Sequence, residues 1–226
     1  MMNTMQSTLR TITTAVLTLG LLTGCAAGGT AMPTDAAGLT QDDVAEMSLH
    51  QEFDAYRDHY QHMQQLLKEA QLPVHAGEWL WGPGDDLPGI GGDGVAPLPG
   101  SDTENSYDMS STRIWSPPGT IDQKRDLQPM IDYFTEQGWT IERRTITGDQ
   151  EVWATTGDGW QIQYTAQENG DNPITVYSEP FWTNDGNALS DAIYGRSTVT
   201  FPDRSLPGEY PPFPSWDDPV VNKPKI

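Results

Sequence analysis

The residues that most clearly indicate chemistry surround the only cysteine of the chain. The apolar run AVLTLGLLTG leads directly to this cysteine, so that the four residues at the junction are Leu22, Thr23, Gly24 and Cys25. The run is too short for a membrane span, which needs roughly 20 apolar residues, but it suits the apolar core of a signal peptide. The spacing is typical of a bacterial lipobox. We therefore expect residues 1–24 to be removed and the Cys25 thiol to carry a diacylglyceryl group. The alternative is a buried free cysteine.

A two-chain lipid anchor holds a protein stably at a membrane surface. We therefore expect the mature protein to lie at the outer face of the cytoplasmic membrane, attached through Cys25. Residues 26–39 are small and poor in apolar side chains, which favours a flexible tether.

The four histidines are the next candidates, because three of them fall on one expected helix. His59 and His62 are one turn apart, but a zinc site needs more ligands than two, and no His-Glu-x-x-His motif is present. The polar side chains of this helix step by four opposite its apolar stripe, which predicts a solvated face; they are Glu46, His50, Asp54, Asp58 and His62. No metal or cofactor is therefore expected.

Acidic side chains offer the only catalytic alternative. Glu142, Glu151, Asp158 and Glu179 lie on or beside a predicted sheet, and two carboxylates at the right separation hydrolyse glycosides. No Gly-x-Ser-x-Gly or Ser-x-x-Lys motif occurs, and no cysteine follows Cys25. The first hypothesis is a non-catalytic protein that binds a ligand or scaffolds the cell envelope. The alternative is a hydrolase of cell-wall or glycan substrates that uses paired carboxylates.

Two further groups of charged residues have the side chains of an ion site. A Gly/Pro-rich loop at 83–104 contains the oxygen donors Asp85, Asp86, Asp93 and Asp102, but it lacks the alternating order of an EF-hand, which favours a merely flexible loop over a calcium site. Arg143 and Arg144 are adjacent on an expected strand, so their side chains should point to opposite faces and form no joint anion clamp.

The charge of the chain restricts its partners. The formal net charge is −20, and every one of the 32 acidic residues follows Cys25. Such a field disfavours nucleic acid and anionic lipid. The negative charge is compatible with basic partners, with metal counter-ions, or with a role in solubility alone beside a membrane. The partner we expect is an envelope protein or a cell-wall component.

These residues must be positioned by one α+β domain at 40–226. A Thr40-x-x-Asp43 capping box opens an amphipathic helix over 41–70, which Pro73 should end. Strands are expected at 74–82 and 109–116. A second helix over 120–137 has a capping box at Thr120 and Gln123 and a stop at Gly138. Its Pro129 implies either a kink or a start near Asp126.

The clearest pattern is a four-stranded antiparallel meander at 139–179, because its segments are joined by short turns rich in Gly, Asp and Asn. Along one strand apolar and polar residues alternate. Trp160, Ile162, Tyr164 and Ala166 should face the helix over 120–137, while Gln161, Gln163 and Thr165 face water.

The last segment, 180–226, is expected to be irregular, with a short strand at STVTF (197–201). The proline-rich tail at 206–226 either binds a partner's aromatic groove or, as we favour, folds back and buries its own aromatic side chains.

The order of these features resembles the LppA-like lipoproteins of mycobacteria and related actinobacteria. The resemblance rests on the lipobox, the helix opening LTQDD, the GDGW at 157–160 and the tail LPGEYPPFPSW. It implies an envelope location and an α+β fold but no reaction. Members of that family often carry a cysteine pair that joins the middle segment to the last meander strand. Here the corresponding segments, ENSYDMS at 104–110 and YSEPFW at 177–182, contain no cysteine.

Overall fold

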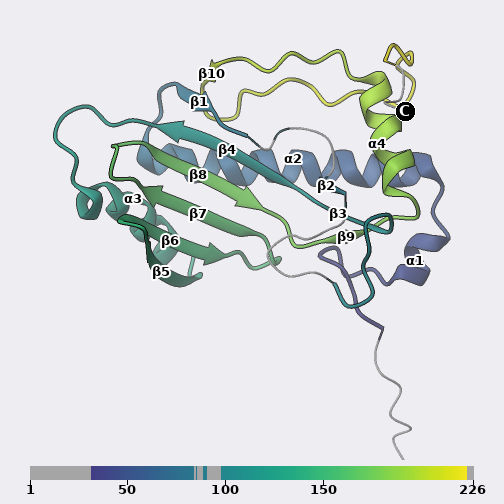
Figure 1. Ribbon diagram of the computed structural model, residues 1–226, viewed down its shortest axis with the longest axis horizontal. Helices are drawn as coiled ribbons and strands as arrows, with labels where there is room; N and C mark the ends of the chain where they lie inside the picture. Colours follow the sequence, from purple (N-terminus) through teal and green to yellow (C-terminus); the bar gives the residue numbers. More distant parts are fainter. Residues whose placement is uncertain (1–31, 84, 86–88, 91–97, 223–226) are drawn as a thin grey trace, which may run out of the picture. The chain divides into compact units, whose positions relative to one another are not determined.

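A computed structural model describes residues 32–83, 85, 89–90 and 98–222 (Figure 1). A seven-stranded antiparallel sheet with helices confirms the expected α+β class. Its strands run in the order β10-β1-β4-β8-β7-β6-β5, and the last four are the predicted meander. They are β10 (Arg204–Ser205), β1 (Trp79–Trp81), β4 (Ser110–Trp115), β8 (Asn172–Tyr177), β7 (Gln161–Ala166), β6 (Asp149–Thr155) and β5 (Thr140–Ile146).

A second, smaller sheet joins segments that are distant in sequence. It pairs β2 (Gly89–Ile90) with β3 (Ser106–Asp108), and β3 with β9 (Phe181–Trp182). Just beyond β3, the Met109 amide donates to Ser178 Oγ and the Ser178 amide donates to the Met109 carbonyl, both at 2.9 Å. The two segments for which the family resemblance implies a cysteine pair therefore lie side by side, held here by hydrogen bonds.

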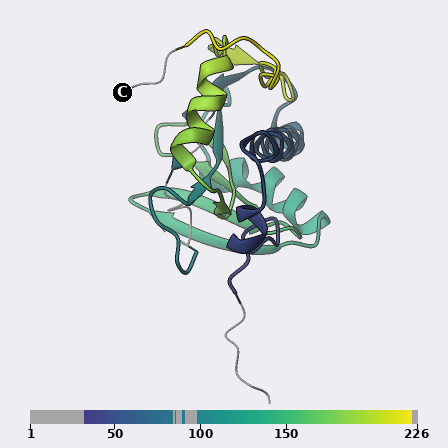
Figure 2. The same cartoon turned by 90° about the vertical axis from the view of Figure 1, so that its right-hand side faces the viewer.

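Two helices cover one face of the large sheet. Helix α2 (Leu49–Val74) lies on β8 and β4, and helix α3 (Gln123–Glu136) lies on β5, β6 and β7. Figure 2 shows both on the same side of the sheet. The side chains predicted for this face are buried, including Ile162 and Tyr164, which have no exposed surface.

The opposite face is less open to water than predicted. Thr165 is buried, which corrects its assignment to the wet face, because it lies opposite the long side chain of Glu151, itself only 7% exposed. Gln161 and Gln163 are half-buried, and both hydrogen bond to carboxylates. This face is a hydrogen-bonded polar layer.

The amino-terminal helix is divided in two. The Thr40–Asp43 capping box is present, but α1 (Gln41–Ala45) ends after five residues, and a second capping box at Ser48 and Gln51 starts α2. The single helix predicted over 41–70 is therefore wrong. Helix α2 also continues through Pro73 to Val74, because a proline in the last turn removes only one donor.

Helix α3 keeps its predicted buried face but not its predicted start. Asp122 caps it by accepting from the Arg125 amide, so the box at Thr120 and Gln123 and the start near Asp126 are both wrong. Pro129 lies inside the helix. Gly138, with φ of +72°, follows the helix end as predicted. The side chains facing the sheet are Leu127, Met130, Ile131 and Phe134.

The expected tether is ordered over the part that the structure describes. Asp35 is buried and accepts backbone hydrogen bonds from Ala37, Leu39 and Trp182. The Ala36 amide donates to the Pro180 carbonyl. The prediction of a flexible tether through residue 39 is therefore wrong for 32–39, and residues 25–31 lie outside the described part.

The carboxyl-terminal segment contains a helix that the sequence did not predict. Helix α4 (Gly186–Arg196) is capped by Asp185. Residues 197–201 form no strand, and the short strand β10 lies just after them. The proline-rich tail folds back as favoured: Tyr210, Phe213 and Trp216 pack against the core.

Candidate functional site

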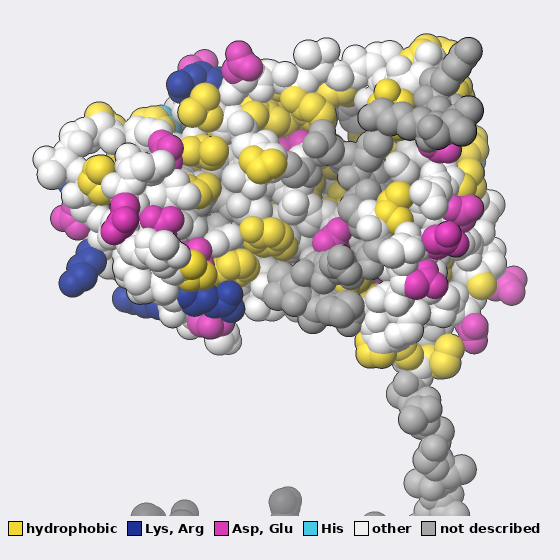
Figure 3. Space-filling view, viewed as in Figure 1, with side chains coloured by type: hydrophobic (Ala, Val, Ile, Leu, Met, Phe, Trp, Pro, Cys, Tyr) yellow, Lys and Arg dark blue, Asp and Glu magenta, His cyan; other side chains and the backbone are white. Residues whose placement is uncertain are grey.

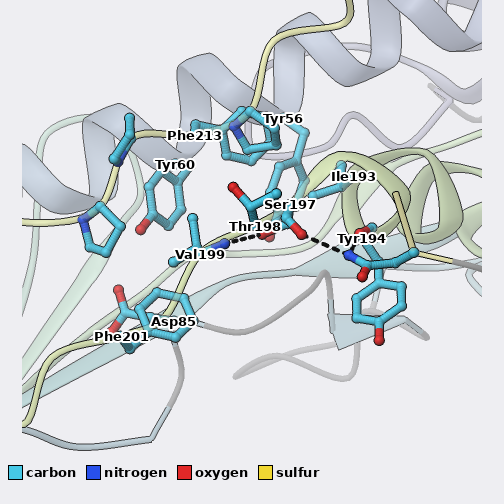
Figure 4. A pocket seen from close by; sticks show the side chains of 14 residues that line it. Tyr56, Tyr60, Asp85, Ile193, Tyr194, Ser197, Thr198, Val199, Phe201 and Phe213 are labelled. Atoms are coloured by element: carbon cyan, nitrogen blue, oxygen red, sulfur yellow. Dashed lines mark hydrogen bonds between the residues drawn. The ribbon is translucent and has the colours of Figure 1, made fainter. Parts of the chain in front are cut away.

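A cavity of about 760 Å³ lies between α2, the end of α4 and the proline-rich tail (Figure 4). Aromatic and proline side chains form most of its wall, and two aliphatic side chains, two hydroxyls, one amide and one carboxylate form the rest. The lining residues are Tyr56, Tyr60, Asp85, Ile193, Tyr194, Ser197, Thr198, Val199, Phe201, Pro211, Pro212, Phe213, Pro214 and Asn222.

Helix α2 and the tail fix the aromatic wall together. Tyr56 and Tyr60 are four residues apart, so they lie on one face of the helix. The Phe213 ring packs between them, with centroid distances of 5.7 Å to Tyr56 and 5.6 Å to Tyr60. Phe213 also lies 5.4 Å from Phe53, which is fully buried below. This wall is therefore held by core packing.

The end of α4 supplies the polar wall. Asn222 donates from Nδ2 to the Tyr194 and Ser197 carbonyls, both at 2.7 Å. The Val221 amide donates to the Gly195 carbonyl at 2.7 Å. These bonds satisfy carbonyls that the helix end leaves without intrahelical partners, and they fasten the chain end beside the cavity.

A buried ion pair lies at the Asp85 side of the cavity. Arg113 Nη1 contacts Asp85 Oδ2 at 2.5 Å, and the two side chains are 2% and 3% exposed. Ser111 Oγ and Gln64 Nε2 also donate to the Asp85 carboxylate, and the Trp81 ring lies 3.4 Å from the guanidinium carbon of Arg113. Almost every donor and acceptor of the pair is thus satisfied within the protein.

The electrostatics of the cavity favour an uncharged occupant. The charge of Asp85 is compensated by Arg113, and among the described residues of the lining there is no other carboxylate or cation. Burial raises the pKa of Tyr60, so its hydroxyl stays neutral and can exchange hydrogen bonds. The arrangement can stack a ring on Tyr or Phe faces and hydrogen bond polar groups at Ser197 and Thr198.

The histidines do not converge. The His59 ring stacks on Phe181 at 3.9 Å and its Nδ1 lies 3.0 Å from the Tyr107 hydroxyl; burial lowers the pKa of His59 to about 4. His62 Nε2 lies 2.8 Å from Asp158 Oδ2. The two rings therefore serve different contacts.

The predicted solvated helix face is partly covered. His50 stacks on Trp216 at 4.6 Å, and His62 meets the Trp160 ring edge-on at 5.4 Å. Asp54 and the exposed Asp58 both pair with Arg57, and Glu46 is exposed. Within the described ranges, no group of three His, Cys, Asp or Glu side chains is placed to hold a metal ion.

Each carboxylate of the hydrolase alternative has its own partner. Glu142 accepts two bonds from Arg144, which lower its pKa. Glu151 accepts from Trp153 Nε1 and Gln163 Nε2, and Glu179 accepts from Gln161. Asp158 contacts Thr156 and His62. None of these four lines the large cavity.

The remaining predicted site residues, those of the Gly/Pro-rich loop and the lipobox, form no common site among the described residues. Asp85 serves the ion pair, and Asp102 accepts from the Glu104 and Asn105 amides. Asp86 and Asp93 lie outside the described residues, as do the lipobox residues Leu22, Thr23, Gly24 and Cys25.

The sequence alone did not indicate the cavity or the ion pair of Asp85 and Arg113. Tyr56 and Tyr60 belong to the apolar stripe of the first predicted helix, a pattern that indicates only core packing. A buried strand that carries an arginine was the available signal, because an arginine there requires a carboxylate partner.

The described helices include none that is long and apolar enough to cross a membrane. The sequence matches no protein-family model, and no curated protein matches it at a significant level. Among solved structures, the fold is similar to the crystal structure of LppA from Mycobacterium tuberculosis. The identity is 11% and the TM-score 0.37, over 76% of this chain and 90% of that one.

Proposed function

We propose that this chain is a lipid-anchored, non-catalytic binding protein of the cell envelope, and that its ligand is a neutral, ring-containing amphipathic molecule held in the large cavity. The observation that carries this proposal is the cavity of about 760 Å³ with its fixed aromatic wall and the internally compensated carboxylate of Asp85, the one carboxylate among its described lining residues.

The size and the wall support a small-molecule ligand. Ligand pockets usually measure about 300–1,000 Å³ and combine apolar walls with a few polar groups. Tyr56, Tyr60 and Phe213 are fixed by packing, so a ligand would lose little binding energy in ordering them. The hydroxyl and amide groups at Ser197, Thr198 and Asn222 would fix the orientation of its polar end.

The lipobox supports the anchor. Only six residues, 26–31, separate Cys25 from the described part of the chain. Six extended residues reach about 20 Å, so the first described residue would lie within about 20 Å of a lipid surface that holds Cys25.

A neutral fluorescent probe tests the cavity. Nile red should bind the purified protein with a rise in fluorescence, and octyl glucoside below its micelle concentration should compete for the site. Val199→Trp places a large ring in the wall and should weaken binding more than about tenfold, since it fills the space that the probe needs. Val221→Trp is the matched control, because Val221 is 55% exposed and does not line the cavity. Equal binding by the two variants would refute the cavity as the site.

Detergent partitioning tests the anchor independently. Cys25→Ser removes the thiol that would be acylated, so the variant should move from the detergent phase to the aqueous phase. If the variant partitions like the wild-type protein, the lipoprotein part of the proposal fails. The cavity part is tested separately by the dye experiment.

A further inference from the structure

A second groove, distant in sequence from the cavity walls, lies between α3 and the edge strand β5. It has a volume of about 440 Å³. Its lining combines basic side chains with the apolar side chains of α3; the residues are Lys124, Leu127, Gln128, Ile131, Arg143, Arg144, Thr145, Gln150 and Glu151. Arg143 and Arg144 both border the groove, but their side chains point to opposite faces as predicted, because Arg143 lies across from buried Val152 and Arg144 lies across from Glu151.

Two of the three cations in the groove are unpaired. Within the described ranges, neither Lys124 nor Arg143 has an acidic side chain within 4.0 Å, and both are exposed. Arg144 is different, because Glu142 binds it through two bonds of 2.9 Å and its guanidinium lies 4.6 Å from the Trp153 ring.

The one carboxylate in the lining does not neutralise the two free cations. Glu151 is only 7% exposed, and its two oxygens accept from Trp153 Nε1 at 2.8 Å and from Gln163 Nε2 at 3.0 Å. These bonds turn it toward the polar layer of the sheet.

Lys124 and Arg143 are two of five described basic side chains that have no acidic side chain within 4.0 Å; the others are Lys68, Arg196 and Arg204. Lys124 and Arg143 differ from the other three because both line one groove. In Figure 3, which views the sheet from the side away from α2 and α3, the visible Lys and Arg side chains lie mainly at the β5 end of the sheet. A guanidinium and an ammonium left free over an apolar floor present several N–H donors to an oxyanion.

We propose that the groove between α3 and β5 binds an anionic group, a phosphate or a carboxylate, carried on a ligand with a short apolar part. Arg143 and Lys124 bind the anion, and the apolar part lies on Leu127 and Ile131. This binding is separate from the cavity proposed above and does not depend on it. Because the rest of the protein is acidic, recognition relies on these short-range contacts.

Three small probes test the site by NMR titration of the purified protein: hexyl phosphate, hexanoate and hexanol. The two anions should shift the amide signals of α3 and β5, and hexanol should not. The stronger of the two anions identifies the headgroup. Arg143→Gln and Lys124→Gln should each weaken binding about threefold to tenfold, as expected for loss of a partly exposed charged hydrogen bond. Salt at about 1 M should also weaken it, since the screening length falls to about 3 Å.

Arg204→Gln is the matched control, because it removes the same charge from an exposed position on β10. Equal weakening by Arg204→Gln would show a general charge effect and overturn the site. The alternative role for Arg143 is to prevent the exposed edge of β5 from pairing with a strand of another molecule. In that case Arg143→Gln would form dimers in sedimentation experiments while anion binding stayed unchanged, which would also overturn the proposal. Absence of shifts with both anions would do the same.

Discussion

The buried pair of Asp85 and Arg113 gives the sharpest stability prediction. Asp85→Asn keeps the size of the side chain but leaves the guanidinium of Arg113 without a counter-charge at 2% exposure. Removing one partner of a buried pair typically costs about 3–5 kcal/mol, because the other charge stays desolvated. In a domain of this size, that cost lowers the melting temperature by very roughly 10 °C. Urea unfolding followed by tryptophan fluorescence measures the loss.

A double-mutant cycle separates the pair from its surroundings. Arg113→Met removes the other charge at similar length, so the double variant should be less destabilised than the sum of the two single variants, by about 1–3 kcal/mol. Glu142→Gln is the control, because its pair with Arg144 is 62% and 40% exposed; it should change the unfolding free energy by less than about 0.5 kcal/mol. If Asp85→Asn costs no more than this control, water reaches the pair and the argument from burial is wrong.

Three further predictions follow from the fold. Ile162→Ala should cost about 2–5 kcal/mol in urea unfolding, whereas Gln163→Ala should cost about 1–2 kcal/mol, because the structure bonds Gln163 to Glu151 and Tyr177; the reverse order would refute the register. The His59 pKa of about 4 against an unfolded value near 6.5 means that the unfolded state binds more protons, so stability should fall by up to about 3 kcal/mol as the pH drops from 6.5 to 4. His59→Phe should flatten that slope in urea unfolding at several pH values, and an unchanged slope would assign it to other groups. Met109→Cys combined with Ser178→Cys should form a disulfide, since the two residues exchange hydrogen bonds across paired strands; closing 69 residues removes about 4 kcal/mol of unfolded-state entropy, less the lost Met109 packing. The melting temperature should then exceed that of the reduced form, and equal values would count against the pairing.

The elements that the sequence predicted best are those specified by local signals. The meander rests on alternation and short turns, and its register follows from both. The buried face of α3 follows from spacing alone. By contrast, α4 contains Gly186 and Gly195 and only a weak apolar stripe, so its helical state depends on packing against α2. Asp185 as a cap was the one local signal that could have indicated it.

The break between α1 and α2 shows how a local signal can be present and still be misread. Thr40 and Ser48 each begin a capping box, and the apolar stripe of the long helix starts only at Leu49, directly after the second box. Glu52 explains the outcome. Its carboxylate, 5% exposed, accepts bonds from Thr183 and Asn184, so the start of α2 is fixed to the loop before α4 by contacts that no local pattern contains.

The candidate site was harder to predict because its parts are distant in sequence and ordinary in type. Arg113 and Asp85 are 28 residues apart. Asp85 is one of 32 acidic residues in the chain, and it lies in a stretch whose composition suggests an open loop. What distinguishes Asp85 is the environment supplied by other elements: the Trp81 ring on the guanidinium, Ser111 from β4 and Gln64 from α2. An arginine buried on β4, which lies between β1 and β8 and contacts α2, must find a carboxylate, so a search from Arg113 outward could have led to an acidic partner. The choice of Asp85 over its neighbours depends on where the chain between β1 and β2 passes, and that is decided by the fold.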